Sequence, residues 1–555
     1  MRYYSIRSVF GGALIFALLT AILVLREHVL LPGYDEWDTV AEFQALLAGQ
    51  FGFLDLFNQH NEHRLFFPRL IFFADFLAFE GRGYLSVAAT LLTQAAHALL
   101  LIHIQRAAIR DSTARILFPA VTLVCLFSLG QSGNFIWGFQ VQFVGVYAAA
   151  TLAVWSFARA LPDLPNGPPL YRRLVLPAFA ITLATFTMAN GIIVGPTCVI
   201  LGLIVGARWT IIGATAAVTL LLAAFYYHGF ESPDQQSVFA AVGSHSLTLL
   251  RYTVTYLGNI TGNNVRVAGT LGSLGLASSA ASFAAVLWDR GRHRPRLVLF
   301  GIGAFIVATA LATAFGRSVL GVSQATEVRY NTPTFIFWVV ELSFWWSLLA
   351  ERRSARWVIV VLTVVVVGCA IHGEVSGATD VRRQARRSRE AGDSLLSATF
   401  DPQAFSYDNE DPPNIQHAAA FLRERRLSIF STDDSLLLGR SLDQAGTLLP
   451  EDACRGGIDK VLADRTLGSA MLRVTGEAMR SGSRGGVDRI YIVDGAHHIV
   501  GYASGNLPDS VHRLWQGYAA GQPGTTIDAY AQLDAGHLCR LGSLPVPPTA
   551  LSEAR

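Results

Sequence analysis

Three carboxylates follow the first apolar stretch of the chain, where Asp35, Glu36 and Asp38 surround Trp37 in LPGYDEWDTV, residues 31–40. A carboxylate held near a membrane surface is less solvated than one in water, so its pKa rises and it becomes a better base. Such a group suits general-base catalysis, in which it takes the proton of a hydroxyl acceptor. In a simpler alternative, Asp38 is the N-cap of a helix over DTVAEFQALL, which leaves Asp35 as the first candidate.

A second polar cluster lies twenty residues later, in NQHNEHRLFFPRL, residues 58–70. Its ionisable members are His60, Glu62, His63, Arg64 and Arg69. These residue types can bind a sugar or a phosphate by hydrogen bonds. Two alternatives stay open. His60 and His63, spaced i and i+3, could hold a metal, although this is not one of the strong zinc spacings. The cluster could also be a network that orders its own loop.

Two arginines begin and end the polar part of AFGRSVLGVSQATEVRYNTPT, residues 314–334. Arg317 ends one apolar run, and Arg329 with Tyr330 begins the next. The planar guanidinium donates two hydrogen bonds at once, so arginine is a natural ligand for phosphate. We therefore predict an anionic headgroup site here. The alternative is that both side chains extend to the membrane interface without binding a ligand.

Amides and aromatic rings alternate in GQSGNFIWGFQVQF, residues 130–143, where Trp137 and Gln140 stand out. Amides beside aromatic faces suit sugar binding. A tryptophan at this depth also fits the aromatic belt of a membrane protein.

The composition predicts the kind of structure that positions these candidate site residues. Hydrophobic residues make up 52% of the 555 and charged residues 15%, against about 25% charged in soluble domains. A net charge of +3 gives no sign of a nucleic-acid partner. The apolar runs predict a polytopic α-helical membrane protein. We expect eleven spans, at residues 8–25, 84–105, 116–130, 141–158, 174–189, 191–207, 209–228, 266–288, 297–315, 333–350 and 357–372.

The arginines predict the orientation, because cytoplasmic loops are enriched in them. With the N-terminus in the cytoplasm, the short basic loops fall inside. The long loops 26–83, 131–140, 229–265 and 316–332 then fall outside, as does the C-terminus. Within the outer segment 32–83, AEFQALLAGQFGFLDLF predicts an amphipathic helix along the membrane surface.

The chain should divide into a transmembrane domain over 1–372, a helical connector over 373–434 and a β-rich extracytoplasmic domain over 435–555. Alternating apolar residues predict a small β-sandwich in the last part, with DGAHH as a hairpin turn. Cys454 and Cys539 bracket it and could form a disulfide in an oxidising compartment; the alternative is two free thiols. The other three cysteines lie in apolar runs and should be buried.

A first span, acids in a long outer loop, a surface-lying amphipathic segment, many further spans and an outer C-terminal domain together resemble the GT-C glycosyltransferase superfamily. NEHRLFFPRL and the GR…RY pair also look like stretches of bacterial membrane proteins presumed to be glycosyltransferases, which implies the bacterial inner membrane. The resemblance implies a polyprenyl-phosphate sugar donor and a glycan, lipid or protein acceptor. YDEWD matches the family's acidic first loop, so Asp35 would be the base, with Glu36 and Asp38 behind it.

The sequence departs from the family in one respect. It lacks a second acid pair like that of metal-dependent members, which leaves a divalent metal cofactor in doubt. Two rival functions stay open. One is a transporter or flippase for a lipid-linked saccharide, for which His97, His103 and Glu341 are the main polar groups inside spans. The other is a non-enzymatic protein of envelope polysaccharide assembly.

Overall fold

The computed structural model describes residues 2–161, 169–231, 238–262, 264–408, 410–464, 471–482, 487, 489–505, 514–534 and 536–547. The chain divides into two compact units. The helical unit comprises residues 1–28, 52–72 and 85–381. The second unit comprises residues 29–51, 73–84 and 382–555 and contains the large sheet.

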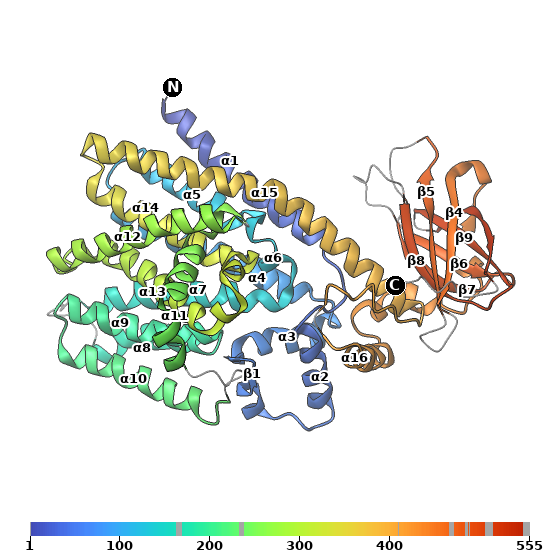
Figure 1. Ribbon diagram of the computed structural model, residues 1–555, viewed down its shortest axis with the longest axis horizontal. Coiled ribbons are helices and arrows are strands. Elements are labelled where there is room, and N and C mark those ends of the chain that lie inside the picture. The colour runs from blue at the N-terminus through green and yellow to red at the C-terminus, as the bar shows by residue number, and fades with distance from the viewer. Residues whose placement is uncertain are drawn as a thin grey trace. The chain divides into compact units, whose positions relative to one another are not determined.

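The helical unit is built mostly from long apolar helices, several of which are joined by short 3-10 turns (Figure 1). Its helices are α1 (Arg2–Arg26), α4 (Tyr84–Ala108), α5 (Ala114–Phe127), α6 (Gly133–Ile136), α7 (Val141–Ala160), α8 (Leu170–Thr185), α9 (Val194–Ile204), α10 (Trp209–Tyr227), α11 (Val238–Leu257), α12 (Val265–Asp289), α13 (Arg294–Arg317) and α14 (Asn331–Leu349). The turns that matter below are η1 (Phe53–Phe57), η3 (Gly138–Gln140), η4 (Ala189–Ile193), η7 (Val322–Thr326) and η8 (Val328–Tyr330). A two-stranded hairpin, β1 (Gln59–His60) with β2 (His63–Arg64), completes it.

Nine helices in the described part of the chain are long and apolar enough to cross a membrane. They match nine of the eleven predicted spans, so the expectation of a polytopic helical protein is confirmed. The other two predicted spans, 174–189 and 191–207, correspond to α8 with 16 residues and α9 with 11. Both are shorter than the roughly 20 residues that cross a bilayer.

The break between α8 and α9 has a steric basis at Gly191. A Cβ there would lie 1.8 Å from the carbonyl oxygen of Ala184, so the chain can turn back closely only through glycine.

The predicted loop over residues 229–265 contains a helix that the sequence did not predict. Residues 238–257 fold as α11, which packs against α12 and α13. Leu249, Tyr252 and Tyr256 are buried and share one face at helical spacing. Serine, histidine, threonine and arginine on the same helix lower its average hydropathy, and this hid the helix. The predicted orientation rests on a count of spans and stays a prediction.

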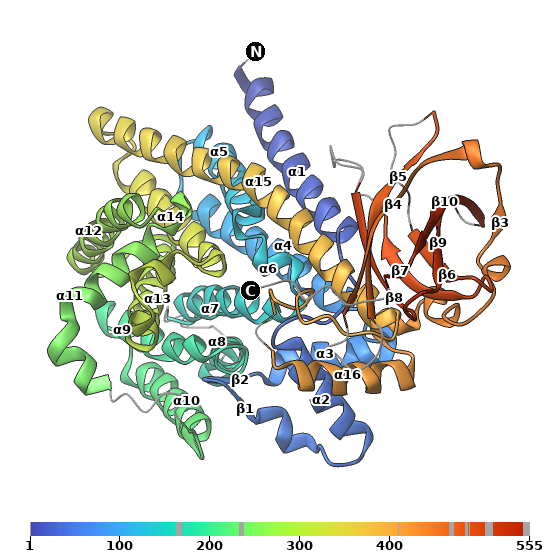
Figure 2. The same cartoon turned by 45° about the vertical axis from the view of Figure 1, so that its right-hand side comes forward.

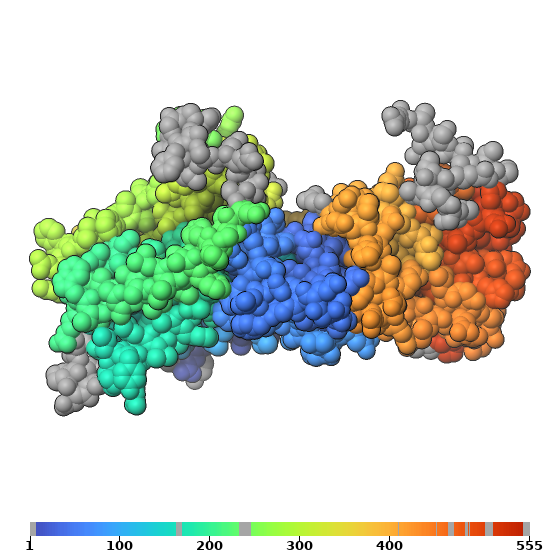
Figure 3. Space-filling view, turned by 90° about the horizontal axis from the view of Figure 1, so that it is seen from below, coloured from blue at the N-terminus to red at the C-terminus, as the bar shows by residue number. Residues whose placement is uncertain are grey.

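Burial separates central from peripheral helices. α7 and α14 bury most of the residues in their apolar windows, whereas α1, α10 and α15 (Arg353–Leu396) bury less than a quarter of theirs. α10 lies at the bottom of Figure 1 and faces the viewer in Figure 3. Its exposed side chains include Trp209, Leu220 and Leu221. Such an apolar outer face suits contact with lipid tails.

α15 is one continuous helix of 44 residues, so the expected domain boundary at residue 372 falls inside it. Its final turns belong to the second unit, together with α2 (Glu36–Leu47), the second half of α3 (Phe66–Phe79) and α16 (Pro412–Arg425). In this unit α2 packs on α3, with the rings of Phe43 and Phe76 stacked at 4.6 Å.

The predicted amphipathic helix over residues 41–57 is shorter than expected. α2 ends at Leu47, and Gly49 then adopts a φ of +71°. A glycine in the left-handed conformation is a common helix terminator. The backbone N–H groups of Ala48, Gly49 and Gln50 donate to the last carbonyls of the helix, so the chain leaves the helical path before η1.

Among the residues that the structure describes, the sheet of the second unit has eight strands in the order β3-β10-β9-β6-β7-β8-β5-β4 (Figure 2). They are β3 (Thr447–Leu448), β4 (Cys454–Asp464), β5 (Met471–Arg480), β6 (Arg489–Asp494), β7 (Ile499–Ser504), β8 (Leu514–Ala520), β9 (Thr526–Asp534) and β10 (His537–Pro545).

A disulfide joins Cys454 on β4 to Cys539 on β10, with Cα atoms 6.2 Å apart. These strands lie near opposite ends of the order, so the sheet curls over a shared core. The predicted C-terminal β-rich domain and the disulfide are confirmed, but the strands belong to one curled sheet and not to the two sheets of the predicted sandwich. Cys125 and Cys198 are buried, and Cys369 is half-buried.

The hairpin predicted at DGAHH is present and joins β6 to β7. The Asp-Gly pair, however, does not supply the positive φ angle of its turn. The residue with positive φ is His497, at 60°, and Gly495 has no positive φ. The Asp494 carboxylate accepts the backbone N–H groups of Ala496 and His498 at 2.9 Å each, which shapes the turn.

Candidate functional site

An ion pair joins two sequence-predicted residues within the helical unit. Glu62 lies at the tip of the β1–β2 hairpin, whose tight turn places Asn61 at a φ of +49°. Arg317 is the last residue of α13. One guanidinium nitrogen of Arg317 donates to the Glu62 carboxylate at 2.8 Å. The hairpin therefore brings one charge of the 58–70 cluster to one end of the 314–334 segment.

His63 supports the same carboxylate. The backbone N–H of Ala189 donates to Nδ1 of His63 at 3.3 Å, which assigns the ring proton to Nε2. That nitrogen faces Glu62 at 3.8 Å. Burial on its own would raise the pKa of Glu62, but His63 and Arg317 outweigh it and lower the pKa to about 2. Glu62 is thus a poor base and a good electrostatic anchor.

Arg64 and Arg69 hold the hairpin to its surroundings. The Arg64 guanidinium donates to the backbone carbonyls of Phe57, Tyr226 and His228 at 2.6 to 2.7 Å. Arg69 is 2% exposed and donates to the carbonyls of Leu56 and Asn58. For these two arginines, the contacts favour the loop-ordering alternative over direct contact with a substrate.

Tyr252 and Tyr330 form a polar cluster beside Arg317. Gln324 on η7 donates to the Tyr330 hydroxyl at 3.1 Å and accepts a hydrogen bond from the Tyr252 hydroxyl. The Arg329 guanidinium lies over the Tyr330 ring, 5.5 Å from its centroid. Both arginines lie within electrostatic reach of Tyr252. The charges at the two ends of the 314–334 segment therefore both act on Tyr252.

Arg329 retains hydrogen-bonding capacity in this cluster. Its Nε is buried and has no hydrogen-bond partner among the residues that the structure describes. A buried donor of this kind costs free energy unless it is satisfied.

Trp137, Gln140 and His60 occupy a different environment. Trp137 and Phe139 stack at 5.6 Å, and the His60 ring meets the edge of Phe139 at 5.2 Å. Gln140 is buried at the end of η3. His60 and His63 thus have different neighbours. In the described part of the chain, no three His, Cys, Asp or Glu side chains gather as a metal site would require.

The YDEWD acids lie in the second unit, and the predicted cap is wrong by three residues. α2 begins at Glu36 with Asp35 in the N-cap position, and Asp38 is an exposed residue of its first turn. The Glu36 carboxylate accepts the backbone N–H of Gly33 at 3.0 Å. Asp35 is half-buried and makes no side-chain capping bond.

Sequence reasoning missed Asp408, which organises the YDEWD segment. Its carboxylate accepts the backbone N–H of Tyr34 and the indole N–H of Trp37, each at 3.0 Å. It also accepts the backbone N–H of Glu410 at 3.2 Å. Burial raises the pKa of Asp408 despite these three bonds, which stabilise the charged form. An acid 370 positions downstream in the sequence carried no signal that linked it to YDEWD.

Fold and site together define a polytopic helical chain with a polar, arginine-bearing cluster between membrane helices and a separate sheet-bearing unit. No family model matches it. No curated protein matches it either. Two solved structures of Archaeoglobus fulgidus are similar to it. One is the archaeal oligosaccharyltransferase AglB with an inhibitory peptide and a dolichol-phosphate, at 14% identity and a TM-score of 0.40. The other is the oligosaccharyltransferase tethered to an acceptor peptide with the NVT sequon, at 13% identity and a TM-score of 0.41.

Each alignment covers 71% of this chain. This chain spans 59% of the first protein and 58% of the second. The activity, substrates and partners of this chain are therefore proposals.

Proposed function

We propose that the chain is a membrane glycosyltransferase of the GT-C type. It moves a sugar from a polyprenyl-phosphate carrier to a glycan, lipid or protein acceptor on the outer face of a bacterial inner membrane. The observation that carries the proposal is the gathering of Arg317 and Arg329 around Tyr252 and Tyr330, between two helices long enough to cross a membrane. Arginine guanidinium groups are donors that suit a lipid-linked phosphate.

In this mechanism the arginines act on the leaving group. When the bond between the anomeric carbon and the phosphate oxygen breaks, the phosphate gains negative charge, and Arg317 and Arg329 stabilise it. Glu62 keeps the Arg317 guanidinium in place before the donor arrives. The donor phosphate then shares Arg317 with this carboxylate, and the unsatisfied Nε of Arg329 supplies a further hydrogen bond.

We assign deprotonation of the acceptor hydroxyl to the YDEWD acids. The acceptor oxygen attacks the anomeric carbon with inversion while its proton passes to a carboxylate, for which Asp35 is the first candidate. Glu36 already accepts a backbone N–H, and Asp38 is exposed to solvent. Because the phosphate is a good leaving group, the reaction needs no general acid.

The test replaces Asp35 and Asp38 singly with Asn in the full-length protein. Transfer is assayed with a membrane extract that contains polyprenyl-phosphate sugars. Asp35→Asn should lower the rate by about 100-fold or more, the contribution expected of a general base. Asp38→Asn is the matched control and should retain most activity. Wild-type rates in both variants would refute the base assignment. No sugar transfer by any form of the protein, the wild type included, would favour a non-enzymatic role.

A second function, translocation of a lipid-linked saccharide, is favoured by polar groups among the membrane helices. Asn190 donates to Tyr147 at 3.4 Å and to Thr309 at 3.5 Å, and the Tyr147 hydroxyl meets that of Tyr256 at 3.4 Å. Polar groups among membrane helices often mark a translocation path. Saccharide movement across sealed vesicles, without sugar transfer by any form of the protein, would support this function.

The three ionisable residues inside the predicted spans, His97, His103 and Glu341, support the transporter function less than this polar group does. His97 is buried and bonded to the Thr151 hydroxyl at 2.8 Å. Glu341 accepts hydrogen bonds from Ser278 at 2.6 Å and from the Trp345 indole at 3.2 Å. His103 is exposed, and its ring meets Trp155 edge to face. Local hydrogen bonds account for the burial of Glu341, whereas Nδ1 of His97 is buried without a hydrogen-bond partner among the described residues.

A further inference from the structure

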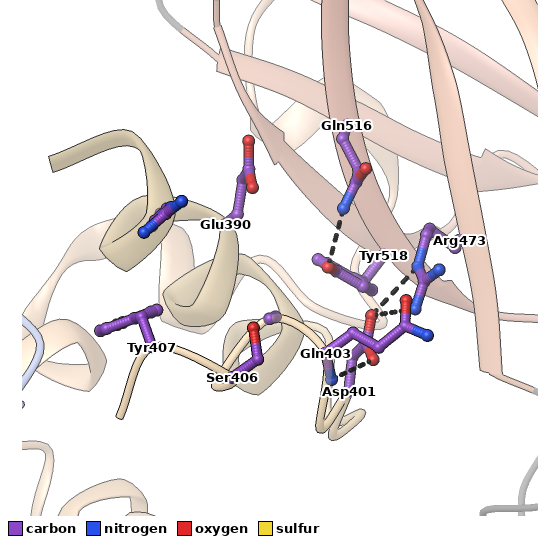
Figure 4. A pocket seen from close by; sticks show the side chains of 10 residues that line it. Glu390, Asp401, Gln403, Ser406, Tyr407, Arg473, Gln516 and Tyr518 are labelled. Atoms are coloured by element: carbon purple, nitrogen blue, oxygen red, sulfur yellow. Dashed lines mark hydrogen bonds and ion pairs between the residues drawn. The ribbon is translucent and has the colours of Figure 1, made fainter. Parts of the chain in front are cut away.

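A polar pocket of about 400 Å³ lies within the second unit, between the end of α15, the turn that follows it and one face of the sheet (Figure 4). α15 contributes Arg387 and Glu390. The turn contributes Asp401, Gln403, Ala404, Ser406 and Tyr407, and the sheet contributes Arg473, Gln516 and Tyr518. Its volume falls within the range of about 300–1,000 Å³ typical of small-molecule sites.

The charges that line the pocket are balanced. Arg473 on β5 donates twice to the Asp401 carboxylate, which is 2% exposed, at 2.5 and 3.0 Å. Glu390 lies 3.8 Å from Arg386 on the same helix, and Arg387 also acts on its charge. With each acid matched by a base, the pocket has no excess charge to attract a phosphate. Its lining is also too polar for an apolar ligand.

The remaining groups suit hydroxyls. Gln403 and Ser406 are exposed at the pocket, and the Gln516 amide donates to the Tyr518 hydroxyl at 3.0 Å. Each of these side chains offers both a donor and an acceptor, as a sugar hydroxyl does. The rings of Tyr407 and Tyr518 add flat apolar surface beside them. Figure 4 shows Gln403 and Ser406 of the turn on the side of the pocket next to Tyr518 of the sheet.

The pocket wall is continuous with the YDEWD segment. The Tyr407 and Tyr34 rings meet edge to face at 6.1 Å, and the next residue, Asp408, holds the Tyr34 N–H and the Trp37 indole. A ligand in the pocket therefore lies one side chain away from the segment that carries Asp35.

We propose that this pocket binds a neutral saccharide unit. Binding follows from the pocket alone, whereas its use as an acceptor subsite rests on the proposed function. Saccharide binding in this pocket needs no residue of the 58–70 or 314–334 clusters.

The test measures binding to the full-length protein in nanodiscs, without a transfer assay. The probes are neutral oligosaccharides of glucose, galactose, mannose and arabinose, two to four units long, detected by saturation-transfer NMR and titrated for Kd. Gln516→Leu and Gln403→Leu should each weaken the best probe at least five-fold. Gln522→Leu is the matched control, because Gln522 lies beyond β8 and outside the pocket lining, and should bind as the wild type does.

Three results would overturn the proposal. They are no binding of any probe to the wild type at 10 mM, an unchanged Kd in both pocket variants, and displacement of the bound saccharide by an equal concentration of inorganic phosphate. Thermal unfolding of each variant verifies folding. Weaker saccharide binding in both pocket variants with transfer intact would refute the role as an acceptor subsite and leave the binding site standing. Saccharide binding without transfer by any form would refute the proposed function alone.

Discussion

The Glu62 carboxylate accepts a hydrogen bond from the Arg317 guanidinium at 2.8 Å, although 255 positions separate the two residues. The pair joins a hairpin tip to the end of a membrane-length helix. Neither residue is fully buried, with side chains 37% and 32% exposed. The pair is therefore sensitive to pH and accessible to a competing anion.

Acid should weaken this link. The pKa of Glu62 is lowered to about 2 in the folded protein, from an ordinary value of 4.5. A depressed carboxyl pKa adds stability that is complete above the unfolded pKa and is lost as pH falls toward the folded one. We expect the Tm to drop between pH 4.5 and 2, by an amount equivalent to about 1 kcal/mol or less because the pair is partly exposed. In Glu62→Gln this part of the pH dependence should disappear. Exposed Glu327 is the control, and Glu327→Gln should titrate as the wild type does.

Lysine should not replace Arg317 in sugar transfer. Lysine keeps the charge but lacks the planar fork that donates two hydrogen bonds at once. We expect Arg317→Lys to lower kcat/KM for the lipid-linked donor by about ten-fold and Arg317→Ala by about 100-fold. Arg296→Lys, at the other end of α13, should leave donor kinetics unchanged. Equal kinetics for the wild type and both Arg317 variants would rule out a phosphate contact at this residue.

Removing the Asp408 carboxylate should loosen the YDEWD segment. Asp408→Ala leaves the buried Trp37 indole N–H and the Tyr34 N–H without their acceptor. Buried donors that lose a partner cost about 1–3 kcal/mol each. We expect a lower Tm and faster hydrogen exchange at residues 33–40. Asp459→Ala, at an exposed position of β4, should leave both measurements unchanged. Unaltered exchange in Asp408→Ala would show that Asp408 does not hold the segment.

The disulfide should stabilise the sheet. It links β4 to β10 across 85 positions and closes the curled sheet. Cys454→Ser with Cys539→Ser should lower the free energy of unfolding of the sheet-bearing unit by about 2–4 kcal/mol. Chemical denaturation with and without reductant measures this, and non-reducing mass spectrometry verifies the pairing. Cys369→Ser is the control, because Cys369 is a free thiol. A wild-type protein that is insensitive to reductant would contradict the prediction.

The parts that the sequence predicted correctly depend on local pattern. In the described part of the chain, nine apolar runs have the length of a bilayer, and alternating residues in the last hundred positions predicted strands. The errors have physical causes as well. Polar residues diluted the apolar face of α11, and Gly49 ended α2 before the predicted amphipathic helix was complete. The acid in the N-cap position of α2 is Asp35, three residues before the one expected.

The sequence by itself determined which residues can do chemistry and which segments are apolar enough for a membrane, because side-chain type and hydropathy are properties of short segments. Only the tertiary structure decided which of those residues meet. It paired Glu62 with Arg317, used Arg64 and Arg69 to hold backbone carbonyls, and gave YDEWD its partner Asp408. These contacts join positions far apart in the chain, and their formation depends on how helices and strands pack rather than on any local pattern.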